Sequence, residues 1–311
     1  MTEDKSLTPQ EVAERLKIAK NTVYELIKRG ELRSYRVGKK IRVSEQAVDE
    51  LTGNIGKKDK LSNQLPDHST NPIIHSENAR GFIICGQDGI LDILARYIEK
   101  DPRGLRTYRS HMGSYNGLFA LYKGEVDIAT CHLWDGEKDV YNSTYAVKML
   151  PGISPLIIRL VKRMQGFYIK KGNPKKILEW PDLFRADVNF INREKGSGTR
   201  VLLDEQARLL NRSARDILGY RNEATSHLAV AGAVARGEAD VGLGNEKAAL
   251  QVPGIEFVPL QRECYDLVMP RENSDKYPFN LVIETVNSLQ FKQGIASLGG
   301  YDVSEMGKII L

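Results

Sequence analysis

Apolar residues recur at helical spacing twice near the start of the chain, within residues 9–16 and 21–29, and a short turn at 17–19 separates the two runs. Residues 8–11 have the spacing of a capping box with proline at the first helical position, and Gly30 follows the second run. We therefore expect two helices joined by a tight turn, with Val23, Leu26 and Ile27 directed inward.

Residues 35–43 read YRVGKKIRV, in which apolar and basic side chains alternate about a glycine. Such alternation predicts a β-hairpin. Ser44 is then placed to cap a further short helix that runs through Leu51. Two helices, a tight turn and a basic hairpin together predict a winged helix-turn-helix domain.

The pattern changes at residue 52. Residues 53–80 are polar, carry scattered glycine, proline, asparagine and serine, and show no sustained period, so we interpret them as a linker. From Gly81 the chain alternates apolar strand runs at 81–86, 105–112 and 127–133 with helical runs at 88–100 and 114–123. This order predicts a parallel, doubly wound sheet, in which ligands bind beyond the carboxyl ends of the strands.

The turn NREKGSGTR joins an apolar strand run to a helical run. Gly196 and Gly198 allow the backbone to approach a ligand, and the helix start presents unpaired N–H groups. Ser197 and Thr199 add hydroxyl groups, and Arg200 adds a fixed positive charge. The turn is therefore a candidate seat for an anion or a carboxylate. The same residues would also serve as an ordinary helix N-cap.

Two segments of the chain have similar sequences, SYNGLFALYKGEVDIATCHL from Ser114 and SHLAVAGAVARGEADVGLG from Ser226. Each has a serine cap, a helix of small residues, Gly-Glu-x-Asp and a strand. We expect two similar α/β lobes, each directing a helix N-terminus into one cleft together with the turn at 196–198. The alternative is two ordinary helix-to-strand junctions that share a glycine C-cap.

Composition and charge narrow the class of protein. The chain has 311 residues, 41% hydrophobic and 27% charged, with no apolar run long enough to cross a bilayer. Three cysteines without a CxxC pair fit a reducing cytosol, so we expect a cytoplasmic protein without a membrane partner. Residues 28–42 carry seven basic side chains and one acidic one, whereas the whole chain is only +5. Such a concentrated basic stretch indicates a polyanionic partner, although a charge run by itself is more often a solvated face.

Residues 7–51 resemble the excisionase-type (MerR-like) DNA-binding domain through LTPQEVAERLKIAKNTVYELIKRGEL and YRVGKKIRVSEQAVDEL. The resemblance implies that the second helix enters the major groove of operator DNA. The side chains implied there are Lys20, Asn21, Thr22 and Tyr24. The wing residues implied to contact phosphate or the minor groove are Arg36, Lys39, Lys40 and Arg42. A protein partner is the alternative, since a minority of such domains bind protein.

The region from Gly81 onward resembles the type 2 periplasmic-binding-protein fold, and most closely its cytoplasmic group related to molybdate- and tungstate-binding proteins. The resemblance lies in the two similar segments from Ser114 and Ser226 and in INREKGSGTRVLLDE. It implies two lobes joined by crossing strands at 158–169 and around 255–268, with the C-terminal helices from Phe279 returning to the first lobe. The expected fold class is thus α/β, an N-terminal winged helix-turn-helix plus a two-lobed clamshell.

The predicted domains are residues 1–52 for DNA binding, 53–80 for the linker and 81–311 for the effector domain. Lobe 1 is expected at about 81–157 and 267–311, and lobe 2 at about 158–266. The candidate ligand-binding residues are Gln87, Asp88, Ser114, Tyr115, Asn116, Gly196, Ser197, Gly198, Thr199, Arg200, Ser226 and His227.

Asp88 departs from the pattern of oxyanion binders, whose first strand-to-helix loop supplies a serine. An Asp88 that only caps its helix leaves molybdate or tungstate open as the ligand. An Asp88 that faces the cleft would repel an oxyanion and favour an amino-acid-like zwitterion.

The motifs of several enzyme classes are missing. GSGTR is neither a nucleophile elbow nor a Walker A loop, and no His or Cys spacing fits a zinc site. We therefore expect a ligand-responsive transcription regulator, not an enzyme, with no metal or cofactor beyond a small-molecule effector. We also expect a homodimer or a larger even oligomer, because such domains act in pairs on repeated half-sites. The alternative is a solute-binding or enzymatic protein that carries the N-terminal domain for recruitment.

Overall fold

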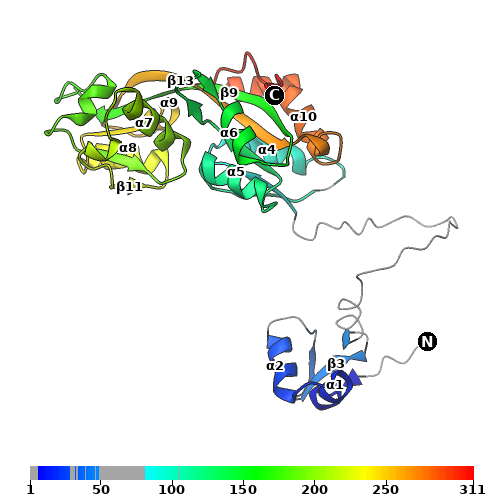
Figure 1. The fold of residues 1–311 in the computed structure, drawn as a ribbon. Helices are drawn as coiled ribbons and strands as arrows, with labels where there is room; N and C mark the ends of the chain where they lie inside the picture. Colours follow the sequence, from blue (N-terminus) through cyan, green and yellow to red (C-terminus); the bar gives the residue numbers. More distant parts are fainter. Residues whose placement is uncertain are drawn as a thin grey trace. The chain divides into compact units, whose positions relative to one another are not determined.

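A computed structural model describes residues 6–28, 32, 34–38, 40–45, 47–48, 81–103 and 105–311. The chain divides into two compact units, Met1–Ile74 and His75–Leu311, which Figure 1 draws in blue and in cyan to red. Within the described residues, no helix combines the length and the apolar character that crossing a membrane requires.

The N-terminal unit contains α1 (Pro9–Leu16), α2 (Lys20–Lys28), β1 (Ser6–Leu7), β2 (Tyr35–Val37) and β3 (Lys40–Ser44). Thr8 caps α1 and forms the predicted capping box with Glu11, and Lys17 ends the helix in the left-handed conformation with φ of 52°. The predicted hairpin is confirmed, since Tyr35 pairs with Arg42 across β2 and β3. The strand β1 was not predicted, and it pairs with β3 to complete a sheet of order β1-β3-β2.

Both helices bury the apolar faces that their spacing predicts. Val12 and Val23 are fully buried and meet Leu32, Val43 and Val48 in one small core. Leu26 and Ile27 pack against this core from its edge. The predicted stop at Gly30 and the predicted helix end at Leu51 lie outside the described residues.

The helices of the C-terminal unit are α4 (Ile90–Glu99), α5 (Ser114–Tyr122), α6 (Ser143–Met149), α7 (Gly198–Leu209), α8 (His227–Arg236), α9 (Glu246–Ala249), α10 (Phe279–Asn287) and α11 (Leu289–Ala296). Its strands are β4 (Phe82–Cys85), β5 (Thr107–Ser110), β6 (Ile128–Cys131), β7 (Trp134–Asp135), β8 (Val140–Tyr141), β9 (Pro155–Lys170), β10 (Phe190–Arg193), β11 (Glu223–Ala224), β12 (Val241–Asn245) and β13 (Ile255–Pro270). Its 3-10 turns are Trp180–Phe184, Ala214–Asp216 and Arg271–Asn273.

One sheet runs through the C-terminal unit in the order β11-β10-β12-β9-β13-β6-β4-β5. Its middle strands β9 and β13 are 16 residues long each, pair antiparallel along their length and pass from one lobe into the other (Figure 1). The outer strands are parallel within each lobe, as predicted, because helices connect them on the faces of the sheet. The two crossing segments implied by the resemblance are therefore confirmed.

Each lobe has its own apolar core. In lobe 1, α4, α10 and α11 pack with β4 around Ile84, Leu94, Val282 and Phe291, so the C-terminal helices do return to the first lobe. In lobe 2, Phe167, Phe190, Leu202 and Leu243 form one core, and α8 packs against β12 in another. Separate cores joined by two strands allow the lobes to move as rigid bodies about those strands.

Candidate ligand-binding cleft and DNA-contacting surface

The solvent side of α2 carries the side chains expected to read DNA. Lys20, Asn21, Thr22 and Tyr24 are exposed, and Tyr24 retains 42% of its surface, whereas Val23 between them is buried. The small core holds α2 by its apolar face, so the polar face stays available to a groove of DNA.

The predicted wing residues are only partly described. On β3, Lys40 is exposed and Arg42 is half-buried. Lys39 and the side chain of Arg36 lie outside the described residues. The contact of the wing with phosphate stays a prediction.

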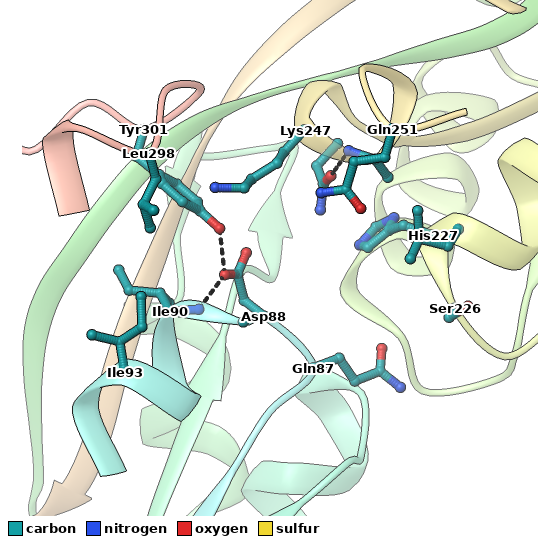
Figure 2. A pocket seen from close by; sticks show the side chains of 14 residues that line it. Gln87, Asp88, Ile90, Ile93, Ser226, His227, Lys247, Gln251, Leu298 and Tyr301 are labelled. Atoms are coloured by element: carbon teal, nitrogen blue, oxygen red, sulfur yellow. Dashed lines mark hydrogen bonds between the residues drawn. The ribbon is translucent and has the colours of Figure 1, made fainter. Parts of the chain in front are cut away.

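In the described part of the chain, two adjoining cavities lie between the lobes of the C-terminal unit. The outer cavity has a volume of about 380 Å³, and the inner cavity one of about 10 Å³, which is room for about one water molecule. Gln87, Asp88 and His227 line both cavities, so these three side chains lie where the cavities meet. Figure 2 shows them among the side chains that line the outer cavity. All three are among the residues predicted from the sequence.

The walls of the outer cavity come from both lobes. Lobe 1 contributes the start of α4 and the C-terminal segment with Leu298 and Tyr301, and lobe 2 contributes Ser226, Lys247 and Gln251 (Figure 2). A molecule that fills this cavity would therefore touch both lobes at once.

Polar groups line the inner cavity, among them Ser114, Thr130, His132, Arg163 and Tyr265. The hydroxyl groups of Thr130 and Tyr265 are 2.7 Å apart. Ser114 corrects one prediction, because Gly113 is the N-cap of α5 and Ser114 is its first helical residue. Its Oγ instead accepts a hydrogen bond of 3.2 Å from the backbone N–H of His132.

Arg163 on β9 forms the centre of a buried ionic cluster. Its guanidinium pairs with Asp88 from lobe 1 and with Glu263 on β13. His132 Nδ1 lies 2.6 Å from the other carboxylate oxygen of Glu263. Burial disfavours ionisation of Glu263, but Arg163 and then His132 outweigh it and lower the pKa of Glu263 from 4.5 to about 2. Burial also disfavours the charge of Arg163, yet Glu263 and Asp88 raise its pKa.

The sequence left open whether Asp88 caps its helix or faces the cleft, and the structure shows that it does both. Its Oδ1 accepts hydrogen bonds from the Ile90 N–H at 2.9 Å and from the Tyr301 hydroxyl at 2.6 Å, so it does serve the start of α4. Its Oδ2 pairs with Arg163. The carboxylate lines the cleft, but its charge is compensated and it does not stand as a bare repulsive group.

His227 opens α8 directly after the cap residue Ser226, whose hydroxyl accepts from the Ala229 N–H. Its Nδ1 is buried and has no hydrogen-bond partner among the described residues. Burial, followed by the charges of Arg193 and Arg163, lowers the pKa of His227 well below 6.5. The imidazole is therefore neutral at pH 7.

The glycine-rich turn does not line either cavity, which corrects the expected position of this seat. Gly196 accepts a hydrogen bond of 2.9 Å from the Tyr115 N–H, and Asn116 Nδ2 donates to the Lys195 carbonyl at 3.2 Å. A Cβ added at Gly198 would come within 2.7 Å of the His132 ring. The N-terminus of α7 thus meets the N-terminus of α5 directly, and the lobes touch across the cleft.

The polar residues of that turn have partners inside lobe 2. Ser197 caps α7 by accepting from the Arg200 N–H, as the N-cap alternative states. Thr199 is buried, and Gln165 Nε2 donates to its Oγ1 at 3.5 Å. Arg200 pairs with Glu223 and stacks on the Tyr220 ring at 4.6 Å. The expectation that Arg200 offers a free charge to a ligand is therefore corrected.

Arg193, which the sequence analysis did not single out, makes a second contact between the lobes. It is almost fully buried, binds Glu194, and donates to Gln87 Oε1 at 2.5 Å. Gln87 Nε2 donates in turn to Glu194 at 3.0 Å. Both ends of the Gln87 amide are thus bonded across the cleft.

Sequence reasoning also missed Arg163, Glu263, Lys247 and Tyr301. A signal was available for the first two, because they are charged residues among the apolar residues of IRLVKRMQGFYI and ECYDLVM, the crossing strands. A charged side chain in a buried strand needs a partner, and such a site is often functional. Nothing in the local pattern marks Lys247 or Tyr301.

The C-terminal unit is a two-lobed α/β domain with a cleft between its lobes, joined in one chain to a helix-turn-helix domain. The chain belongs to the PBP superfamily, whose family profile matches residues 95–287, more than half of its length. A helix-turn-helix profile matches residues 6–52. This combination is consistent with a ligand-sensing, DNA-binding regulator.

The chain is similar over most of its length to a further bacterial protein and to solved structures. The uncharacterized protein YvgK of Bacillus subtilis (strain 168) is 40% identical over 316 residues, which span 100% of this chain and 99% of that one. An ABC-type phosphate transport receptor from Vibrio cholerae is 17% identical with a TM-score of 0.52, and the match covers 71% of this chain and 98% of the receptor. An H2O2-bound cysteine-to-serine mutant of OxyR from Corynebacterium glutamicum is 15% identical with a TM-score of 0.52, over 94% of this chain and 89% of OxyR. At these identities the two structures show the fold alone.

Proposed function

We propose that this protein is a cytoplasmic transcription regulator that binds DNA through its N-terminal domain and a small anion in the cleft of its C-terminal unit. The observation that carries the proposal is the cleft itself, whose two cavities are walled by both lobes in a chain that also has a helix-turn-helix domain. A ligand that contacts both lobes favours their closed arrangement, and this difference in affinity is what regulation requires.

An inorganic oxyanion, molybdate or tungstate in particular, is the first candidate effector. Two features support it. The starts of α5 and α8, which are the positive ends of these helices, border the cleft, and Asp88 is paired with Arg163. A carboxylate is the second candidate, and the size of the outer cavity favours it.

In this proposal the protein binds its effector without converting it chemically. The described cleft holds an ion pair between Arg163 and Glu263, and Glu263 with a pKa of about 2 is a weak base at pH 7. Incubation of any bound anion with the protein, followed by mass spectrometry, should return that anion unchanged.

A thermal-shift screen of the full chain with molybdate, tungstate, phosphate, carboxylates and amino acids tests the effector. An anion at 100 times its Kd adds about 2.7 kcal/mol to the stability of the folded state. DNA selected by the full chain from a random-sequence library then serves as the probe for regulation. An anion that stabilises the protein should change its affinity for this DNA, and an unchanged affinity for every stabilising anion contradicts the proposal.

A further inference from the structure

Lys247 is a cation of the outer cavity that has no carboxylate partner in the described part of the chain. It lies in α9 of lobe 2, and its Nζ is 4.3 Å from the ring centre of Tyr301 in lobe 1. Figure 2 shows the side chain extending into the cavity toward Tyr301. An aromatic face holds an ammonium group without neutralising it, so the positive charge remains available to the cavity.

The other charged side chain that lines this cavity, Asp88, already has partners. Asp88 is bonded to Arg163, the Tyr301 hydroxyl and the Ile90 N–H, which together occupy both of its oxygens. The first turn of α8, with His227 and its N–H group, adds positive potential on the same side as Lys247. Arg163 is shared between Asp88 and Glu263, whereas no carboxylate among the described residues pairs with Lys247, so its ammonium group can bind an anionic ligand directly.

Apolar side chains form much of the remaining wall. Ile90, Ile93 and Leu298 contribute from lobe 1, and Leu228 and Ala248 contribute from lobe 2. The cavity volume of about 380 Å³ lies at the lower end of the range of pockets that hold small organic molecules. A bare tetrahedral oxyanion would leave this wall in contact with water, whereas a hydrocarbon body would cover it.

We infer that the outer cavity is a binding site for an organic monocarboxylate. The carboxylate binds Lys247 near the start of α8, and its hydrocarbon part lies against Ile93 and Leu298. This inference rests on the proposed function, because it takes the cleft to be the effector site. It assigns to that site the second of the two candidate ligand classes, a carboxylate, and a specificity-determining residue.

Titration calorimetry of the full chain with hexanoate, benzoate and phenylacetate, and with their uncharged amides, tests the site. We expect at least one carboxylate to bind the wild type, and Lys247→Met to weaken its binding about 10-fold or more, because a charged hydrogen bond is lost. The amides should bind wild type and Lys247→Met equally. Lys148→Met removes an exposed lysine on α6 that lines neither cavity, so it should leave every affinity unchanged.

A second variant tests the same site from lobe 1, opposite Lys247. Leu298 is 45% exposed, so Leu298→Asp should fold normally, which its thermal midpoint checks. The added negative charge should weaken the binding of the carboxylates about as much as Lys247→Met does. It should leave the binding of the amides unchanged.

Binding of none of the three carboxylates to the wild type, or equal binding to Lys247→Met, overturns the inference. If phosphate or molybdate binds wild type and Lys247→Met equally while the carboxylates do not bind, the inference fails and the proposed function survives. If the carboxylates bind through Lys247 but never change the affinity for the selected DNA, the ligand site stands and the regulatory function fails.

Discussion

Arg163 shows how this protein keeps a charge in its interior. Removing a guanidinium from water is costly, and Arg163 recovers that cost through two carboxylates and through the Tyr265 ring, whose centre lies 4.3 Å from the guanidinium carbon. The partners come from β13 and from the start of α4, so the cluster ties lobe 1 to the strands that cross between the lobes. Loss of one carboxylate would remove one of the two ion pairs that offset the cost of burying this charge.

Glu263→Gln should therefore destabilise the C-terminal unit at pH 7. A pKa lowered from 4.5 to about 2 corresponds to about 3 kcal/mol of stability. Because the folded-state pKa is the lower one, this stability is present above about pH 4.5 and is lost as the pH falls toward 2. Urea unfolding followed by tryptophan fluorescence measures it, since both tryptophans, Trp134 and Trp180, lie in this unit.

The control for that variant is Glu256→Gln, which removes an exposed carboxylate from the same strand. Its stability should equal that of the wild type at every pH. The difference between wild type and Glu263→Gln should shrink between pH 4.5 and pH 2.5. A difference that stays constant over this range would contradict the ionised state assigned to Glu263.

At the scale of elements, the contact between the starts of α5 and α7 decides how closely the lobes approach. Gly113 and Gly198 let the backbones meet, because a Cβ at either position would lie 2.7 Å from an atom of the other lobe. The Tyr115 N–H donates a hydrogen bond to the Gly196 carbonyl oxygen across the same contact. The glycines that suggested a ligand seat are instead explained by contact between the lobes.

Gly198→Ala should hold the lobes apart and weaken the binding of any anion that the screen identifies, by about 10-fold or more, while the unit remains folded. Gly294→Ala in α11 is the matched control, since a Cβ there meets open space and alanine favours the helix by about 0.5–1 kcal/mol. Calorimetry with the identified anion and small-angle scattering measure the two effects. Wild-type affinity in Gly198→Ala would show that this contact is not needed for binding.

The wing of the N-terminal unit is the second element that can be tested. Lys40 is exposed on β3, so Lys40→Ala should weaken binding to all DNA sequences alike and reduce the slope of log K against log salt by about 1. Lys148→Ala should leave both the affinity and the slope unchanged. If Lys40→Ala also has the wild-type slope, Lys40 makes no phosphate contact.

At the scale of the whole molecule, a single helix-turn-helix domain offers only a short contact with DNA. Regulators of this kind read repeated half-sites as symmetric pairs. We therefore predict a homodimer or larger even oligomer, and light scattering at micromolar concentration should give at least twice the mass of one chain. A monomeric mass both with and without the selected DNA would contradict this prediction.

The sequence alone determined the parts of this protein that depend on neighbours along the chain. The capping box at Thr8, the hairpin from Tyr35 to Ser44 and the cap at Ser197 each rest on residues a few positions apart. The alternation of strands and helices from residue 81 also predicted the parallel sheet, and the resemblance to the type 2 periplasmic-binding-protein fold implied the two crossing strands. Helical period, turn residues and caps are local properties, so they can be recognised without a structure.

Only the tertiary structure decided which polar groups meet in the cleft. Asp88 finds Arg163 at a separation of 75 residues and Tyr301 at 213, while Arg163 finds Glu263 at 100. Lys247 reaches Tyr301 from the other lobe, and Arg200 turns from the cleft to Glu223. No spacing rule relates such residues, because their contact depends on how two lobes close over the crossing strands and on which buried charges can compensate each other.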